Sequence, residues 1–204
     1  DTDDLKEIIK IIRETIPVGF NRHKTAQDPA WMPEVTGNLP IVTQEYDNAL
    51  YQIGTLGSGN HFIEIQQGSD GYIWIMVHSG SRNIGFTVAN HYHAIAQELN
   101  QAAGEDIAND LAFLPESSKY FTLYKNEMDY CLEFALANRT LMMERVKTAF
   151  TQVIPEVEFA DFINKPHNFA AEEEHFGETV IVHRKGATRA RKGEWGMIPG
   201  SQGT

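Results

Sequence analysis

The stretch Gly54-Thr-Leu-Gly-Ser-Gly-Asn-His-Phe-Ile-Glu-Ile-Gln66, with its sequel Val77-His-Ser-Gly-Ser-Arg-Asn-Ile-Gly85, is the most informative part of this chain. Each half places a histidine beside glycines, which let the backbone approach another group closely. The first half passes from a glycine-rich turn into an apolar and polar alternation, which predicts a strand near 61–66. The apolar run 72–77 has strand length, so we predict a buried strand that ends at His78.

Two histidines at strand ends, His61 and His78, each beside a Gly/Ser loop, suggest a metal and phosphate site. Imidazole binds several divalent metals, and successive backbone N–H groups form a concave site for anions. The alternative is that each histidine is an ordinary polar residue at the end of a strand. The spacing alone leaves both interpretations open, because short motifs match by chance.

The composition is that of a soluble globular protein, and the 204 residues carry a formal charge of −11. No repeat, low-complexity tract or linker divides the chain, so we expect a single domain over residues 1–204. The only cysteine, Cys131, excludes an internal disulfide framework and favours a reducing, cytoplasmic location. No apolar run is long enough to cross a bilayer. The excess of acidic over basic residues argues against a general nucleic-acid-binding protein.

Apolar residues recur at helical spacing in three segments, which predicts helices over 4–15, 86–102 and 117–150. Cys131 falls within the apolar stripe of the last segment, which predicts a buried thiol. In that segment Asn138-Arg139 is interpreted as a solvated polar patch. Prolines interrupt residues 18–50, which we expect to be irregular.

The fold class expected from these elements is α+β. Strands near 61–66, 72–77 and 178–183 would form a mixed sheet around the site, and the helices would pack outside it. A further helix is predicted to start after Asn168, which would place His167 and Asn168 near a helix N-terminus, a position suited to anions. The order of the strands is not readable from the sequence.

A basic loop follows the predicted strand 178–183. It holds five of the 17 lysines and arginines within nine residues, namely Arg184, Lys185, Arg189, Arg191 and Lys192. Clustered cations in an otherwise acidic chain indicate a phosphate-binding loop. A flexible solubilising loop is the alternative.

Six motifs occur in the order in which the RtcB family carries them. They are Gly-Thr-Leu-Gly-Ser-Gly-Asn-His-Phe-Ile-Glu (54–64), Val-His-Ser-Gly-Ser-Arg (77–82), Ala-Asn-Arg (137–139), His-Asn-Phe-Ala (167–170), His-Arg-Lys-Gly-Ala-Thr-Arg-Ala (183–190) and Ile-Pro-Gly-Ser-Gln-Gly-Thr (198–204). The chain therefore resembles the RtcB family, the RNA-splicing ligases that depend on GTP and manganese. The resemblance extends from residues 16–19 to the last residue.

The resemblance implies roles for individual residues. His61, His78 and His167 match the histidine ligands of two Mn²⁺ ions. The positions that match GTP- or GMP-binding segments are Asn60, His61, Phe62, Ile63, Glu64, His167, Asn168, Pro199, Gly200, Ser201 and Gln202. Arg82, Lys185 and Arg189 lie in motifs that we expect to contact RNA phosphate.

The reaction that the resemblance implies joins an RNA end bearing a 2′,3′-cyclic phosphate or 3′-phosphate to a 5′-hydroxyl end, through a 3′ end activated by GMP. The RNA partners would be tRNA halves or broken RNA. Glu64 could accept hydrogen bonds from the N–H edge of guanine, which would favour GTP over ATP. Two other classes stay open: a metal-dependent phosphodiesterase that uses no nucleotide, and a non-catalytic RNA-binding module.

Some family features have no counterpart in these 204 residues. The Asp-x-x-Cys metal motif is missing. The His-Gly-Ala-Gly-Arg segment with the guanylylated histidine would follow Thr204, the last residue, so the resemblance assigns no catalytic residue within the chain. We therefore expect the chain to be an internal portion of a longer enzyme that does not join RNA by itself. Gln202 stands where the family usually has Met, and Asn83 where it usually has Gly.

Overall fold

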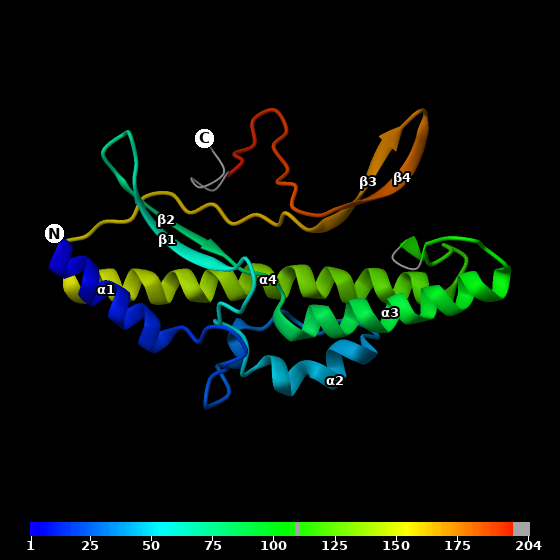
Figure 1. The fold of residues 1–204 in the computed structure, drawn as a ribbon, viewed down its shortest axis with the longest axis horizontal. Coiled ribbons are helices and arrows are strands. Elements are labelled where there is room, and N and C mark those ends of the chain that lie inside the picture. The colour runs from blue at the N-terminus through cyan, green and yellow to red at the C-terminus, as the bar shows by residue number, and fades with distance from the viewer. Residues whose placement is uncertain (109–110, 198–204) are drawn as a thin grey trace.

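A long helix, α4 (Lys119–Val153), runs the length of the molecule in the computed structural model, which describes residues 1–108 and 111–197. In Figure 1 the helices α2 (Pro40–Ala49) and α3 (Arg82–Ala103) lie below α4, and α1 (Thr2–Thr15) crosses the left end of α4 and continues below it. Two β-hairpins and the extended chain that leads to the second of them lie above it. The helix α4 therefore separates a helical layer from the layer that carries the predicted site.

The three predicted helices are confirmed, and local signals explain where they begin and end. Asp1 and Asp4 form a capping box at the start of α1. The Oγ of Ser118 accepts the Tyr120 N–H at 3.2 Å at the start of α4. The helix α3 ends at Gly104, whose φ of 74° is left-handed. It begins at Arg82, earlier than the predicted 86.

The prediction that residues 18–50 are irregular is wrong, because α2 and a short 3₁₀ turn, η1 (Pro29–Trp31), lie within them. The cap of α2 comes from far away in the sequence. Glu127 of α4 is fully buried and accepts the Val42 N–H at 2.7 Å and the Tyr92 hydroxyl at 2.7 Å. A carboxylate stabilises a helix N-terminus because it accepts hydrogen bonds from free N–H groups and its negative charge interacts favourably with the helix dipole.

The apolar core has two parts, both built on α4. The first joins α2, α3 and α4 and includes Val88, Tyr92 and Phe134. The second joins α1 and α4 through Ile8 and Met142, and the first hairpin packs against it. Cys131 is a buried free thiol, as predicted, and burial raises its pKa to about 12.

The α+β class is confirmed, but the predicted mixed sheet is wrong. Strands β1 (Phe62–Gln67) and β2 (Ile73–His78) form one antiparallel pair, with Phe62 opposite His78. Strands β3 (Phe169–His175) and β4 (Glu178–Arg184) form a second, separate pair. In the described part of the chain, the segment 178–183 therefore pairs with β3 alone.

Two further expectations about these strands are wrong. The chain after Asn168 forms β3 and not a helix, because its residues pair along their whole length with β4. The strand β2 is not buried, since Ile73 and Trp74 are each 55% exposed and only one face of the hairpin packs on the helices. Among the described residues, no helix combines the length and apolar character needed to cross a membrane.

Candidate functional site

Three imidazoles from distant parts of the chain come together above α4. His61 lies just before β1, His78 ends β2, and His167 precedes β3. The ring centroids of His61 and His78 are 5.7 Å apart, and those of His78 and His167 are 4.9 Å apart. The Nε2 atoms of His78 and His167 are 2.7 Å apart, a hydrogen-bond distance. The structure thus gathers the three histidines that the family motifs single out.

The tautomer of His61 follows from its hydrogen bond to the Leu56 carbonyl, 2.9 Å from Nδ1. A carbonyl oxygen only accepts, so Nδ1 carries the proton and the neutral ring has a lone pair on Nε2. Metal-binding histidines in proteins are commonly oriented by such a bond from the second ring nitrogen.

The glycine-rich loop is needed for close packing around His61. Gly57 has a φ of 94°, and a Cβ at this position would overlap Nη1 of Arg82 and lie 2.7 Å from Nδ1 of His61. Arg82 itself has a left-handed φ of 56° and donates from Nε to the Thr55 hydroxyl at 3.0 Å. The loop therefore encloses the Arg82 side chain beside His61.

Burial lowers the pKa of all three histidines. The Arg82 charge further lowers the pKa of His61, and the Arg139 charge that of His78. The charges of His78 and Arg139 further lower the pKa of His167. The rings are therefore neutral at pH 7, which is the form that binds metal ions.

The three rings fit a metal ion by donor type but not by their present spacing. Within residues 1–108 and 111–197, no group of three or more His, Cys, Asp or Glu side chains is arranged to hold one ion. Two imidazole nitrogens on one ion, with bonds of about 2.1 Å, lie roughly 3.0–3.4 Å apart. The 2.7 Å between the Nε2 atoms of His78 and His167 is shorter, so their hydrogen bond must open before both bind one cation.

The residues predicted to contact guanylate divide between the two faces of the first hairpin. Phe62 lies opposite His78 in the register, with ring centroids 5.1 Å apart. Glu64 shares that face because alternate residues of a strand point the same way. Its Oε2 is buried and has no hydrogen-bond partner within residues 1–108 and 111–197. The Ile63 side chain packs against the helical core. Asn60 is exposed just before His61.

The basic loop is attached directly to the segment that carries His167. The Gly186 N–H donates to the Asn168 side chain at 2.8 Å, and the Ala187 N–H donates to the His167 carbonyl at 2.9 Å. Lys185, next to these bonds, is exposed. Arg189 instead pairs with Glu194 at 3.1 Å.

The last of the six motifs, 198–204, lies outside the described part of the chain. It contains the predicted guanylate residues Pro199, Gly200, Ser201 and Gln202. Thr204, after which the resemblance places the guanylylated histidine, also lies outside the described residues. The location of the catalytic histidine beyond Thr204 therefore stays a prediction.

Comparison with known proteins agrees with the sequence motifs. The family model described as tRNA-splicing ligase RtcB matches residues 32–204. The chain belongs to the RtcB family.

Named relatives in the RtcB family come from bacteria, archaea and eukaryotes. The chain is 35% identical to RNA-splicing ligase RtcB of Escherichia coli strain K12, over 98% of the chain and 55% of that protein. It is 33% identical to tRNA-splicing ligase RtcB of Thermococcus kodakarensis, over 75% of the chain and 39% of that protein. An RtcB homolog of Entamoeba dispar is 33% identical over 68% of the chain and 30% of its own length. The chain thus spans about half or less of the length of these relatives.

The interpretation of Asn138-Arg139 as a solvated patch is wrong. Asn138 is fully buried and accepts the N–H groups of Gly54 at 2.7 Å and Thr55 at 3.2 Å. It donates to the Thr55 carbonyl, the Ser79 hydroxyl and the Gly80 carbonyl at 3.1–3.2 Å. The position is recognisable in the sequence, because Asn138 lies four residues after Phe134 and four before Met142, on the apolar face of α4.

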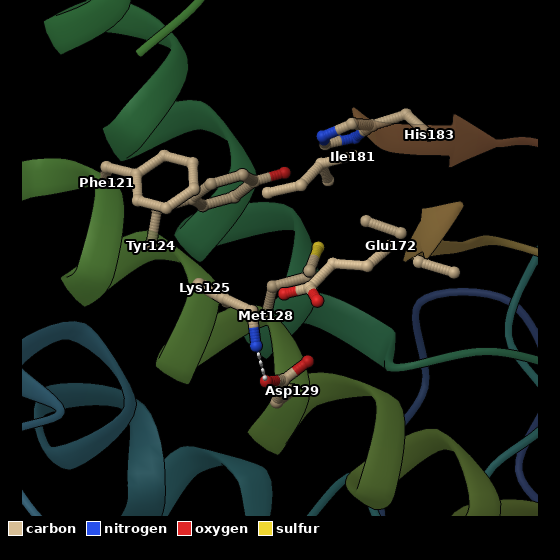
Figure 2. A pocket seen from close by; sticks show the side chains of 10 residues that line it. Phe121, Tyr124, Lys125, Met128, Asp129, Glu172, Ile181 and His183 are labelled. Atoms are coloured by element: carbon tan, nitrogen blue, oxygen red, sulfur yellow. Dashed lines mark hydrogen bonds and ion pairs between the residues drawn. The ribbon is translucent and has the colours of Figure 1, made fainter. Parts of the chain in front are cut away.

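A cavity of about 200 Å³ separates α4 from the second hairpin (Figure 2). The rings of Tyr124 and His183 on its wall are nearly parallel, with centroids 6.4 Å apart. Lys125 and Asp129 form an ion pair of 3.5 Å on the helix side, drawn as a dashed line in Figure 2. Among residues 1–108 and 111–197, none of those predicted for RtcB-type metal, guanylate or RNA binding lines this cavity.

Proposed function

We propose that this chain supplies metal-binding and guanylate-binding residues to a GTP- and Mn²⁺-dependent RNA ligase. The enzyme would join RNA ends that bear a 2′,3′-cyclic phosphate or 3′-phosphate to 5′-hydroxyl ends, in tRNA splicing or RNA repair. One observation carries the proposal. His61, His78 and His167, which the RtcB resemblance assigns to the metal, lie in ring contact although they are far apart in sequence.

The metal would be held by Nε2 of the three neutral histidines. Of His78 and His167, the ring that donates their Nε2 hydrogen bond would first move its proton to Nδ1. A bound divalent ion would polarise phosphoryl oxygens and neutralise charge that develops on them. The His61 bond to the Leu56 carbonyl would fix the ring in one tautomer while Nε2 binds. Imidazole alone suits Zn²⁺ or Ni²⁺ better than Mn²⁺, so the choice of manganese rests on the family resemblance.

The guanylate would lie on the outer face of the first hairpin. The unpartnered Oε2 of Glu64 is an acceptor for the N–H groups on the edge of guanine, and adenine lacks that pair of donors. A buried acceptor left unpaired costs free energy, so this carboxylate would discriminate between the two bases. Phe62, beside His78 on the same face, would contact the nucleotide with its ring.

The RNA would approach along the basic loop. Lys185 is exposed within two residues of the bonds that join this loop to His167 and Asn168. A cation in this position would bind the phosphate backbone and contribute salt-dependent affinity. Arg189 is already paired with Glu194, so we assign it the smaller part of RNA binding.

The test is a joining assay on the protein that carries this chain, with RNA bearing 2′,3′-cyclic phosphate and 5′-hydroxyl ends, GTP and Mn²⁺. We expect His61→Ala, His78→Ala and His167→Ala each to reduce joining at least 100-fold. The matched control is His91→Ala, which removes an exposed histidine of α3 and should leave joining within twofold. Metal-dependent RNA cleavage without a guanylate adduct would instead indicate a phosphodiesterase. RNA binding that ignores chelators, without reaction, would indicate a binding module.

A further inference from the structure

Arg139 of α4 has a buried donor that no group in the described part of the chain uses. Its Nε donates to the Asn164 side chain at 2.8 Å, and its Nη1 donates to the Ser79 carbonyl at 3.0 Å. Its Nη2 is buried and has no hydrogen-bond partner among the described residues. Buried side-chain donors are nearly always satisfied in folded proteins. An unsatisfied one close to a cluster of histidines therefore needs an explanation.

The charge of Arg139 is also uncompensated by any described residue. No carboxylate in residues 1–108 or 111–197 forms an ion pair with it. Burial lowers its pKa to about 10, so the guanidinium is still protonated at pH 7. A buried, unpaired cation is costly, and an anion that binds to it offsets that cost.

The two partners of Arg139 place it beside the histidine pair. Ser79 directly follows His78, and Asn164 lies three residues before His167. The Arg139 charge lowers the pKa of both histidines, so it lies within electrostatic range of both rings. One arginine therefore holds the chain on each side of the pair and retains one free donor.

A second arginine of α4 shows the contrasting arrangement. Arg145 donates from Nη1 to the Gly54 carbonyl at 2.7 Å, and from Nη2 to the Gln27 side chain. Burial lowers its pKa as well. Both of its terminal nitrogens are used within the protein, so Arg145 has a structural role, and Arg139 differs from it by one free Nη2.

The structure assigns Arg139 as the donor of an oxyanion site next to His78 and His167, which takes one non-bridging oxygen of a phosphate group. The planar guanidinium is suited to this, because it keeps its two protein contacts while Nη2 makes a charge-assisted bond to the anion. The assignment of that phosphate to a substrate, either the guanylate or the RNA 3′ end, rests on the proposed function. The oxyanion site itself does not.

The test titrates the metal-free protein that carries this chain with inorganic phosphate at pH 7.5 and follows binding by calorimetry and by the ring signals of His78 and His167. Arg139→Gln should lower phosphate affinity at least tenfold, and Arg139→Lys about threefold. The control Arg145→Gln should lower the melting temperature but leave phosphate affinity within twofold. Unchanged affinity in a folded Arg139→Lys or Arg139→Gln variant, or no binding to the wild type, would overturn the assignment.

Titration with GMP and with an RNA that ends in a 3′-phosphate identifies the source of the phosphate, because only the ligand that uses the site loses affinity in Arg139→Lys. The same variants in the joining assay separate this inference from the proposed function. If Arg139→Gln loses phosphate binding but the wild-type protein does not join RNA, the oxyanion site is supported and the ligase function is rejected. Joining by Arg139→Gln with wild-type kcat and KM rejects the assignment of the bound phosphate to a substrate of the ligase.

Discussion

The two hairpins have the same number of strands but are attached to the molecule in different ways. The first, β1–β2, buries Ile63, Ile65, Ile75 and Val77 against the core formed by α1 and α4. In the described residues, the second, β3–β4, contributes no side chain to either part of the core, and a cavity lies between it and α4 (Figure 2).

The second hairpin is stabilised mainly by polar contacts within itself. Glu173 accepts two hydrogen bonds from Arg184, at 3.0 and 2.6 Å, and one from His175 at 2.9 Å. Backbone and amide bonds near Asn168 connect its end to the histidine segment. Burial of apolar area fixes the first hairpin and two of the histidines, whereas the second hairpin carries a cationic loop whose position depends on fewer, more exposed contacts.

The largest expected effect comes from the amide that attaches the first hairpin to α4. Asn138→Ala leaves several buried backbone groups near Gly54 and Ser79 without partners, and we expect a loss of about 3 kcal/mol or more in the free energy of unfolding. Asn168→Ala, which removes one exposed bond to the second hairpin, should cost less than about 1 kcal/mol. Urea denaturation measures both, and equal losses would remove the distinction between the hairpins.

A smaller effect is expected from apolar truncation on the two hairpins. Ile65→Ala removes a side chain packed against the second part of the core and should cost about 2 kcal/mol, because a cavity forms in its place. Ile181→Ala on β4 should cost about 1 kcal/mol or less, since Ile181 already lines a cavity. Thermal unfolding of both variants tests the order. A larger loss for Ile181→Ala would show that β3–β4 is the better packed hairpin.

The smallest effect is a dependence on pH that only the second hairpin should show. Arg184, and then His175, lower the pKa of Glu173 from 4.5 to about 2. The folded hairpin therefore gains stability from the ionised carboxylate above pH 4.5 and loses it as the pH falls from 4.5 to 2. The protection of the β3 and β4 amides, relative to their intrinsic exchange rates at each pH, should fall over that range in the wild type. In Glu173→Gln this fall should be absent, and an identical fall in that variant would contradict the assignment.

The sequence predicts those elements whose signals are local. The helices α1, α3 and α4 carry their own apolar stripes, and the predicted strands lie within a residue or two of β1, β2 and β4. The helix α2 escapes prediction because its cap, Glu127, lies 85 residues from Val42. The prediction of a helix in place of β3 is wrong because the acidic run has no clear period, and only pairing with β4 makes it a strand.

For the site, family motifs identify the histidines, but spacing alone does not predict their convergence. His78 and His167 are 89 residues apart, and only tertiary structure brings their Nε2 atoms together. The prediction for Asn138 and Arg139 is wrong because polar residues on a helix are usually solvated. The position of Asn138 within the apolar stripe of α4 is the signal that outweighs that expectation.

His167 lies in a stretch without regular secondary structure, and this has a consequence for what the site admits. Asn164 is held to α4 by bonds to the Leu136 carbonyl and the Thr140 hydroxyl. On the other side the His167 carbonyl accepts the Ala187 N–H at 2.9 Å, and β3 begins two residues later at Phe169. Single polar bonds therefore position this imidazole, and a cation could part His78 and His167 without a change in α4 or in the first hairpin.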